Sequence, residues 1–279
     1  MSSAFIRLQH LAPQHALSKL AGRFADTTTP WIRDPLIRRF IAAYDVDMSE
    51  AAEPVEAYPT FNAFFTRALK PGARPLADAE RFVLSPADGV VSQIGEIAGG
   101  RIVQAKARDY SVAELLAGDA GDAHRFDGGR FVTIYLSPKD YHRVHMPAAG
   151  TLRQTRYVPG DLFSVNGVTA EGVERLFARN ERLACLFDGA LGRFASVMVG
   201  AMIVAGVETV WSGRVQPHGR VIDSRDFSRG PAFAAGDEMG RFYLGSTVVL
   251  LFEPGKVEWL EGIGAGSTVR MGQALGRRL

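Results

Sequence analysis

Ser246 follows a glycine inside a strongly apolar stretch, GRFYLGSTVVLLFEPGKVEW at residues 240–259. The stretch predicts a buried strand, and a glycine in such a strand often marks a bulge or a close approach of two backbones. A barrel corner would explain Gly245, Ser246 and Thr247 without any chemistry. The alternative is that the Gly245–Ser246 peptide bond is itself a reaction site, with the Ser246 hydroxyl as its nucleophile.

Two histidines, His142 and His145, stand three residues apart in KDYHRVHMP, residues 139–147. Positions i and i+3 of a straight strand point to opposite faces, so only a bent backbone would bring both imidazoles into one pocket. No metal is expected, because no third ligand with suitable spacing accompanies the pair. Their grouping beside Tyr141 and Arg143, in a chain with six histidines, nevertheless favours a functional site.

Asp88 in SPADGVV is the third candidate, although Asp followed by Gly is also ordinary turn chemistry. A serine hydroxyl needs a base to remove its proton, and the base works best when a carboxylate fixes its tautomer and orientation. Asp88, a histidine and Ser246 would supply these three groups. Their positions in the sequence leave open whether they meet in the fold.

The elements that must position these residues are mostly strands. The chain has 279 residues, 47% of them hydrophobic, and its 30 glycines and 14 prolines are spread among short apolar runs. This composition predicts one large folded domain, or a domain with an appendage, that is rich in strands and turns. We therefore expect an α+β fold, in which N-terminal amphipathic helices precede a β-rich catalytic domain shaped like a sandwich or barrel.

Turn signals divide the chain into two regions, residues 1–70 and residues 71–279. The first is expected to be helical, and its last short helix, in TFNAFFTRALKPGARPL, is expected to end at Pro71 and Gly72. The second is the expected β-rich domain.

Within the β-rich region, TAEGVERLFARNERLACLF at residues 169–187 predicts a helical interlude. SPADGVVSQ at residues 85–93 and MPAAGTLRQ at residues 146–154 are similar to each other. Both predict a Pro-initiated turn that enters a strand, as at equivalent corners of a sandwich or barrel.

Cys185 is the single cysteine, which excludes an internal disulfide and a multi-cysteine metal site. Because it lies in the apolar run ERLACLFDG, inert core packing is favoured over a reactive thiol. The N-terminal sequence lacks the unbroken apolar stretch of a secretory signal, and no run reaches the roughly 18 residues of a spanning helix. The chain is expected to stay on the cytoplasmic side.

The N-terminal segment is basic and has apolar residues at helical spacing. These residues are Phe5, Leu8, Leu11, Leu17, Leu20, Phe24, Leu36, Ile37, Phe40, Ile41 and Tyr44. A basic amphipathic helix that also carries Trp31 suits a membrane interface, where its cations meet anionic headgroups. A helical lid packed on the body would have the same stripe, so the pattern alone leaves both interpretations open.

Seven ordered blocks give the sequence a resemblance to a known family. They are FNAFFTRALKPGARP, SPADG, DYHRVHMP, YVPGDLFSVN, LFARNER, VGAMIVAGVETV and MGRFYLGSTVVLLF. In this order, and across nearly the whole chain, they resemble the bacterial phosphatidylserine decarboxylase proenzymes. LGST alone would be weak evidence, because any string of four residues recurs by chance.

The resemblance implies a self-cleaving decarboxylase. Ser246 would attack the carbonyl of Gly245, moving the acyl group from nitrogen to oxygen, and elimination would then break the ester. Ser246 would become a covalent pyruvoyl group at the start of fragment 246–279, which remains with fragment 1–245. The pyruvoyl group would form a Schiff base with phosphatidylserine and accept the electrons left by departing carbon dioxide, giving phosphatidylethanolamine.

The resemblance also implies roles for other residues. Asp88 would orient His145, the base that takes the proton of Ser246, and His142 would assist decarboxylation or protonate the product. Residues 1–70 would attach the protein to an anionic membrane surface, as a peripheral protein on the cytoplasmic face of the cell membrane. A homodimer is expected, and no nucleic-acid partner.

The residues that contact the headgroup stay open. Asn166, Asn180 and Arg182 lie in family-like blocks, where headgroup contacts and loop capping are equally expected. Arg143 could bind phosphate through its guanidinium or fix the loop between the two histidines.

Two other classes of function remain possible from the sequence. SPADGVVSQIG and GSTVRMGQALG resemble turns of lipoyl-type β-sandwich carriers, although the lysine at a hairpin tip is lacking. A metal- or serine-dependent hydrolase could use His142, His145 and Ser246. Either class would leave the chain in one piece, whereas the proenzyme interpretation requires two pieces.

Overall fold

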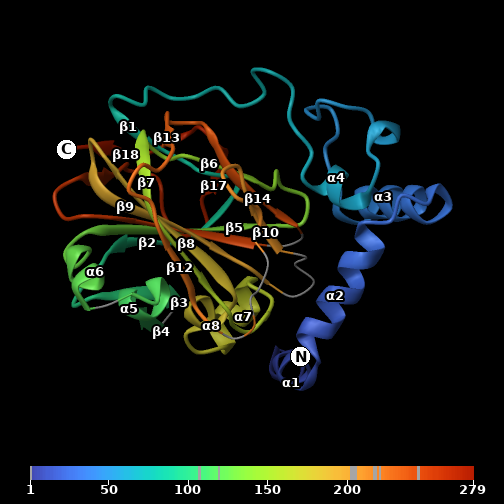
Figure 1. The fold of residues 1–279 in the computed structure, drawn as a ribbon, viewed down its shortest axis with the longest axis horizontal. Helices are drawn as coiled ribbons and strands as arrows, with labels where there is room; N and C mark the ends of the chain where they lie inside the picture. Colours follow the sequence, from blue (N-terminus) through green and yellow to red (C-terminus); the bar gives the residue numbers. More distant parts are fainter. Residues whose placement is uncertain are drawn as a thin grey trace.

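The structure, a computed structural model, describes residues 2–279 except 106, 107, 119, 202–205, 216–218, 220, 244 and 245. Its N-terminal part contains α1 (Ser2–Leu11), α2 (Gln14–Ala25), α3 (Pro30–Tyr44), a short 3-10 turn (Val55–Ala57) and α4 (Phe61–Phe65). These helices stand to one side of a β-rich body (Figure 1). The predicted α+β order, helices first and strands after, is confirmed.

The body is built on a nine-stranded antiparallel sheet with the order β12-β7-β8-β9-β15-β5-β2-β17, and β13 pairs with β7. Its strands are β2 (Gly89–Glu96), β5 (Arg130–Leu136), β7 (Gly150–Val158), β8 (Arg182–Gly189), β9 (Gly192–Val199), β12 (Asp223–Asp226), β13 (Ala232–Phe233), β15 (Ser246–Phe252) and β17 (Thr268–Val269). β15 therefore lies near the middle of the sheet, with β9 and β5 as its neighbours.

Smaller sheets and short helices cover the large sheet. The smaller sheets have the orders β11-β10-β14-β6, β1-β18-β16 and β3-β4. Their strands are β1 (Phe82–Leu84), β3 (Arg101–Ala105), β4 (Arg108–Ser111), β6 (Arg143–His145), β10 (Gly206–Thr209), β11 (Gly213–Arg214), β14 (Glu238–Tyr243), β16 (Val257–Trp259) and β18 (Ala274–Arg278). The helices are α5 (Val112–Leu116), α6 (Ala120–Arg125), α7 (Gly167–Gly172) and α8 (Leu176–Arg179).

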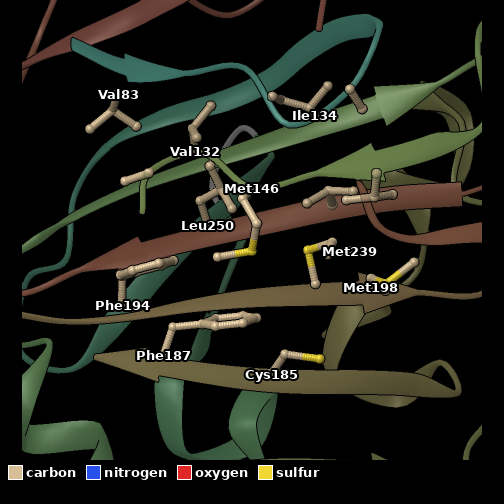
Figure 2. Close-up of a cluster of buried hydrophobic side chains, with 14 of the residues drawn as sticks. Val83, Val132, Ile134, Met146, Cys185, Phe187, Phe194, Met198, Met239 and Leu250 are labelled. Atoms are coloured by element: carbon tan, nitrogen blue, oxygen red, sulfur yellow. The ribbon is translucent and has the colours of Figure 1, made fainter. Parts of the chain in front are cut away.

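Both faces of β15 are buried, which explains its apolar run from Val248 to Phe252. Leu250 and Phe252 enter a core shared with the smaller sheets, where Leu250 lies among side chains of several strands (Figure 2). Val249 and Leu251 enter a second core, shared with α5, α7 and α8. A strand covered on both faces has no need of alternating polar residues, so the part of β15 after Thr247 is entirely apolar.

Two predicted helical segments need correction. The helix after Thr60 ends at Phe65, well before Pro71, because Thr66 already leaves helical geometry as the C-cap. The interlude at residues 169–187 is helical only in α7 and α8, and its last part forms β8. LACLF, residues 183–187, is apolar at every position because both faces of β8 are buried, and such a run gives no period that separates strand from helix.

The two similar turns are confirmed as entries to strands. SPADG leads into β2 at Gly89 and MPAAG leads into β7 at Gly150. The segments also lie side by side, because the Leu84 amide donates to the Pro147 carbonyl at 2.9 Å. Cys185 is fully buried in β8, and burial raises the pKa of its thiol, so the predicted core role is confirmed. Among the described residues, no helix is both long and apolar enough to cross a membrane.

Candidate active site

Ser246 is the first residue of β15 and is completely buried. It pairs with Leu136, the last residue of β5, so its hydroxyl lies where the central strands of the large sheet end. The Oγ atom has no hydrogen-bond partner among the described residues. A buried hydroxyl without a partner is costly, so it calls for an explanation, of which a catalytic role is one. Gly245, the other half of the predicted cleavage site, lies outside the described residues.

His142 is the last residue of the loop that follows β5, and it is also completely buried. Its Nδ1 lies 2.8 Å from the Asp140 carbonyl oxygen, and its ring packs on Phe65 with centroids 4.0 Å apart. A carbonyl only accepts, so Nδ1 carries the proton and Nε2 is a bare acceptor, which has no partner. Burial lowers the pKa of His142 to about 3, which keeps the ring neutral.

The segments that carry Ser246 and His142 converge. The His142 carbonyl accepts from the Phe242 amide at 3.0 Å, four residues before Ser246 in the chain. The loop that bears His142 starts directly after Leu136, the partner of Ser246 in the sheet. The structure thus brings the backbones of a buried hydroxyl and a buried neutral imidazole to the same end of β15.

His145 ends β6 and is 8% exposed. Its Nδ1 lies 2.8 Å from the Gly236 carbonyl oxygen and its Nε2 lies 3.1 Å from the Tyr141 hydroxyl. Nδ1 therefore donates to Gly236, and Nε2 accepts from Tyr141, whose pKa burial raises to about 12. Burial likewise lowers the pKa of His145, so this ring is also a neutral base.

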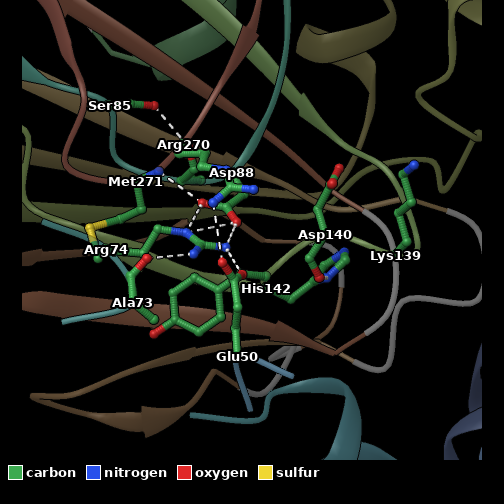
Figure 3. Close-up of polar contacts among 12 residues, drawn as sticks. Glu50, Ala73, Arg74, Ser85, Asp88, Lys139, Asp140, His142, Arg270 and Met271 are labelled. Carbon is green, nitrogen blue, oxygen red and sulfur yellow. Dashed lines mark hydrogen bonds and ion pairs between the residues drawn. The ribbon is translucent and has the colours of Figure 1, made fainter. Parts of the chain in front are cut away.

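Asp88 lies in a different set of contacts from the one the sequence predicted (Figure 3). Both carboxylate oxygens accept from Arg74, at 2.5 to 3.1 Å, and one accepts from the Met271 amide at 2.8 Å. The link to His145 is through the backbone, because the His145 amide donates to the Pro86 carbonyl at 2.8 Å. Direct orientation of His145 by Asp88 remains a prediction.

The residue after Asp88 has to be glycine for a steric reason. A Cβ on Gly89 would come within 2.3 Å of the Tyr135 carbonyl oxygen, so only glycine lets the turn approach β5 this closely. The Asp–Gly pair is therefore more than a generic turn. Gly89 allows the chain to enter β2 and leaves Asp88 at the edge of the large sheet.

Three residues near the site were not singled out from the sequence. Arg74 holds Asp88 and also Glu50, whose carboxylate is 2.8 Å away, and Tyr141 holds Nε2 of His145. Arg74 stands in the KPGARP block that carries the resemblance, but its type and position do not indicate its partner. Tyr141 was noticed only as a neighbour of the histidines.

The four side chains considered for headgroup contact have structural roles. The Asn166 side chain caps α7, and Asn180 bonds the Phe163 and Gly200 backbones. Arg182 donates to four carbonyl groups, those of Glu114, Leu115, Ala178 and Asn180. Arg143 pairs with Glu238 at 2.7 Å and donates to the Thr66 carbonyl, which favours its loop-fixing role.

His142 should make the stability of the fold depend on pH. Unfolded histidine takes up a proton below about pH 6.5, whereas folded His142 stays neutral down to about pH 3, so acid favours the unfolded chain in this window. The comparison is made in a Ser246→Ala background, which keeps one chain. Between pH 7 and pH 5, the free energy of unfolding should fall by about 2 kcal/mol less in the His142→Gln variant than in the chain that keeps His142. Urea titrations at pH 8, 7 and 5 measure this. Equal falls in both chains would contradict a buried neutral His142.

Within the part of the chain that the structure describes, no group of three or more His, Cys, Asp or Glu is arranged to hold a metal ion. The site residues Ser246, His142 and His145 supply a nucleophilic hydroxyl and two neutral imidazole bases. Fold and site together define an α+β enzyme that places a buried serine and histidine at one end of its central strand.

Comparisons with known proteins identify the family. A profile for phosphatidylserine decarboxylase matches residues 61–277, and a second profile, described as PSD, matches residues 4–45. The chain is 57% identical over 277 residues to a phosphatidylserine decarboxylase proenzyme of Ectopseudomonas mendocina, covering 98% of this chain and 97% of the relative. Proenzymes of the same name from Saccharophagus degradans and Alcanivorax borkumensis are 56% and 54% identical, covering 97% and 98% of this chain and 96% and 95% of the relatives. The chain belongs to the phosphatidylserine decarboxylase family.

Proposed function

We propose that this chain is a proenzyme that cuts itself between Gly245 and Ser246 and then decarboxylates phosphatidylserine to phosphatidylethanolamine. The observation that carries the proposal is the buried, unpartnered Ser246 hydroxyl at the start of the central strand. Family membership supports the reaction, because the relatives are named phosphatidylserine decarboxylase proenzymes.

In self-cleavage, Ser246 Oγ attacks the Gly245 carbonyl while a base takes the hydroxyl proton. The peptide C–N bond breaks as the ester C–O bond forms, and the proton goes to the released nitrogen. Elimination across Cα and Cβ of residue 246 then frees the Gly245 carboxylate. Hydrolysis of the dehydroalanine releases ammonia and leaves a ketone at residue 246.

We assign the base to His145. Its neutral state and its fixed tautomer suit proton uptake, and Tyr141 would have to yield Nε2 to the serine. When His145 takes up the proton, the Gly236 carbonyl and the charges of Glu238 and, to a lesser degree, Asp88 favour the imidazolium, since each acts to raise the pKa of His145 against burial and the charge of Arg143. Arg74 and the Met271 amide keep the Asp88 carboxylate in place for this role.

The residues around Ser246 fit the pyruvoyl group that the family implies. A group formed from Ser246 needs no entry path, and His142, whose loop meets the same end of β15, has an Nε2 without a hydrogen-bond partner among the described residues. When present, the group supplies a carbonyl that binds the substrate amine and accepts the electrons released with carbon dioxide. His142 would hold or move a proton at Nε2, and Phe65 would keep water from that ring.

The short fragment would stay bound after cleavage. Fragment 246–279 begins with β15, which pairs along its length with β5 and β9. It also contains β17, paired with β2, and β18, paired with β1. Since these contacts all join it to fragment 1–245, cleavage need not release the short piece.

The N-terminal helices support attachment to a membrane surface. Gln9 and Gln14 are buried and hydrogen-bonded to the Ser164 and Leu162 amides of the body. The apolar stripe of α1 and α2 faces outward, with Leu8 66% and Leu11 84% exposed, whereas the apolar residues of α3 pack with those of α4. A lid would bury its apolar stripe, so the exposed stripe of α1 and α2 favours the interpretation of residues 1–70 as a membrane-association region.

Replacing exposed residues of that stripe should abolish vesicle binding. Because each apolar side chain contributes on the order of 1 to 2 kcal/mol, the triple variant Leu11→Gln, Leu20→Gln, Phe24→Gln should bind anionic vesicles roughly 10²- to 10⁴-fold more weakly. Flotation with phosphatidylglycerol vesicles measures this, and wild-type binding should also weaken with salt. Val221→Gln, at a site on the body that is 71% exposed, is the matched control. Equal flotation of triple variant and control would contradict the proposal.

Attachment at the cytoplasmic face of the cell membrane and a homodimer are further parts of the proposal, and sedimentation in detergent checks the dimer.

Self-cleavage is tested by denaturing mass spectrometry of the purified chain. Two pieces are expected, and the shorter one should begin with a carbonyl that reacts with hydroxylamine. A single unmodified chain that still releases carbon dioxide from phosphatidylserine vesicles would refute the mechanism.

A further inference from the structure

Tyr141 occupies the nitrogen of His145 that the proposed base would use. Its hydroxyl lies 3.1 Å from Nε2 of His145, and the centroids of the two rings lie 5.7 Å apart. Both side chains are buried. Nδ1 of His145 donates to the Gly236 carbonyl, so Nε2 carries the lone pair and the Tyr141 hydroxyl is the donor. The base is therefore already paired before any reaction begins.

The nucleophile is in the opposite condition. The Ser246 hydroxyl is completely buried and has no partner among the described residues. Nε2 of a neutral imidazole offers one lone pair, so Ser246 can donate to it only when Tyr141 does not. Self-cleavage by the proposed route therefore requires an exchange of partners, in which His145 gives up Tyr141 and takes Ser246.

Tyr141 is not needed to set the tautomer of His145. The Gly236 carbonyl already does this at 2.8 Å, and the Gly236 amide is itself fixed, because it donates to the Met146 carbonyl at 2.9 Å. Burial raises the pKa of Tyr141 to about 12, so its hydroxyl keeps its proton and remains a donor at neutral pH. The hydroxyl of Tyr141 thus adds one thing to the site, the occupation of Nε2.

We infer that Tyr141 is a positioning residue for self-cleavage, whose hydroxyl holds Nε2 of His145 and slows the attack of Ser246. The inference rests on the proposed function and adds to it a residue that sets the rate of maturation. In the uncut chain, the same hydrogen bond satisfies an imidazole nitrogen that would otherwise be buried without a partner. Tyr141 therefore stabilises the folded proenzyme and delays its cleavage.

Tyr141→Phe should cut itself faster than the wild type. The phenyl ring keeps the packing on His145 but cannot donate, so the rate should rise roughly 2- to 10-fold, as expected for the loss of one net hydrogen bond. The fraction cut after timed synthesis, by mass spectrometry, measures the rate. Tyr110→Phe is the matched control, because Tyr110 is a fully buried tyrosine of β4 in the second core. It should be cut at the wild-type rate.

A double variant shows whether the effect of Tyr141 passes through His145. His145→Gln has no basic nitrogen for Tyr141 to occupy, so adding Tyr141→Phe to it should leave its slow cleavage unchanged. A merely structural role would change the rate in both backgrounds. Equal acceleration by Tyr141→Phe with and without His145 would therefore contradict the inference.

A second measurement needs no cleavage. In a Ser246→Ala background, which keeps one chain, the nitrogen-15 resonance of Nε2 of His145 should move to higher chemical shift when Tyr141→Phe removes the hydrogen bond. An unmoved resonance would contradict the hydrogen bond itself. If Tyr141→Phe does not fold, Tyr141→Leu, which also lacks the hydroxyl, replaces it in each measurement with the same expected results.

The outcomes separate this role of Tyr141 from the proposed function. A wild-type chain that stays uncut would overturn both together. A wild-type chain that is cut, with an equal or slower rate in Tyr141→Phe, would overturn only the role of Tyr141 and leave self-cleavage at Ser246 standing.

Discussion

Ser246→Ala should remain a single chain of 30.3 kDa and release no carbon dioxide from phosphatidylserine, whereas the wild type yields two pieces and is active. The reason is chemical, because alanine has no oxygen with which to attack the Gly245 carbonyl or to form the ketone. The loss should be complete, since the hydroxyl at the first position of β15 is the one that the mechanism uses and alanine removes it. Denaturing mass spectrometry and trapping of carbon dioxide measure the two effects.

Ser196→Ala is the matched control. Ser196 lies opposite Leu250 on β9, is fully buried, and also has a hydroxyl without a partner. Its replacement removes the same atom from the same sheet, opposite a residue that stands four positions after Ser246. Normal cleavage of Ser196→Ala beside an uncut Ser246→Ala would separate nucleophile loss from damage to packing. Cleavage of Ser246→Ala itself would remove the basis of the mechanism.

The sequence could single out Ser246, the proposed nucleophile, because it departs from a local rule. A Gly–Ser pair inside an apolar run contradicts the packing pattern of a buried strand, and such departures concentrate at functional sites. The same run predicted β15, since a strand covered on both faces needs only apolar residues. The helices before residue 45 were predictable because an amphipathic period can be read locally.

Other features depended on contacts between distant parts of the chain. LACLF could not be assigned to β8 because its neighbours β7 and β9 decide whether an apolar run is strand or helix. The partner of Asp88 could not be read from its turn, because Arg74 lies 14 residues earlier and Glu50 earlier still. The orientation of the N-terminal stripe was equally hidden, since it depends on Gln9 and Gln14 reaching the loop at residues 162–164.

His145→Gln should block self-cleavage, and His142→Gln should block decarboxylation in a chain that is still cut. His145 is the proposed base for Ser246, and loss of a well-placed base slows a reaction roughly 10²- to 10⁴-fold. Glutamine keeps a donor for the Gly236 carbonyl but has no basic nitrogen, so the fold should survive while the rate falls. The fraction cut after timed synthesis, by mass spectrometry, measures the effect.

The two variants control each other, because both remove a buried neutral imidazole from the same short segment. His142→Gln should give both fragments at the normal rate but lower kcat by roughly 10²- to 10⁴-fold. The wild-type cleavage rate should vary little between pH 8 and 6.5, since burial lowers the pKa of His145 and keeps the base neutral there. If His142→Gln stopped cleavage and His145→Gln did not, the roles would be exchanged, and the unpartnered Nε2 of His142 would become the base for Ser246.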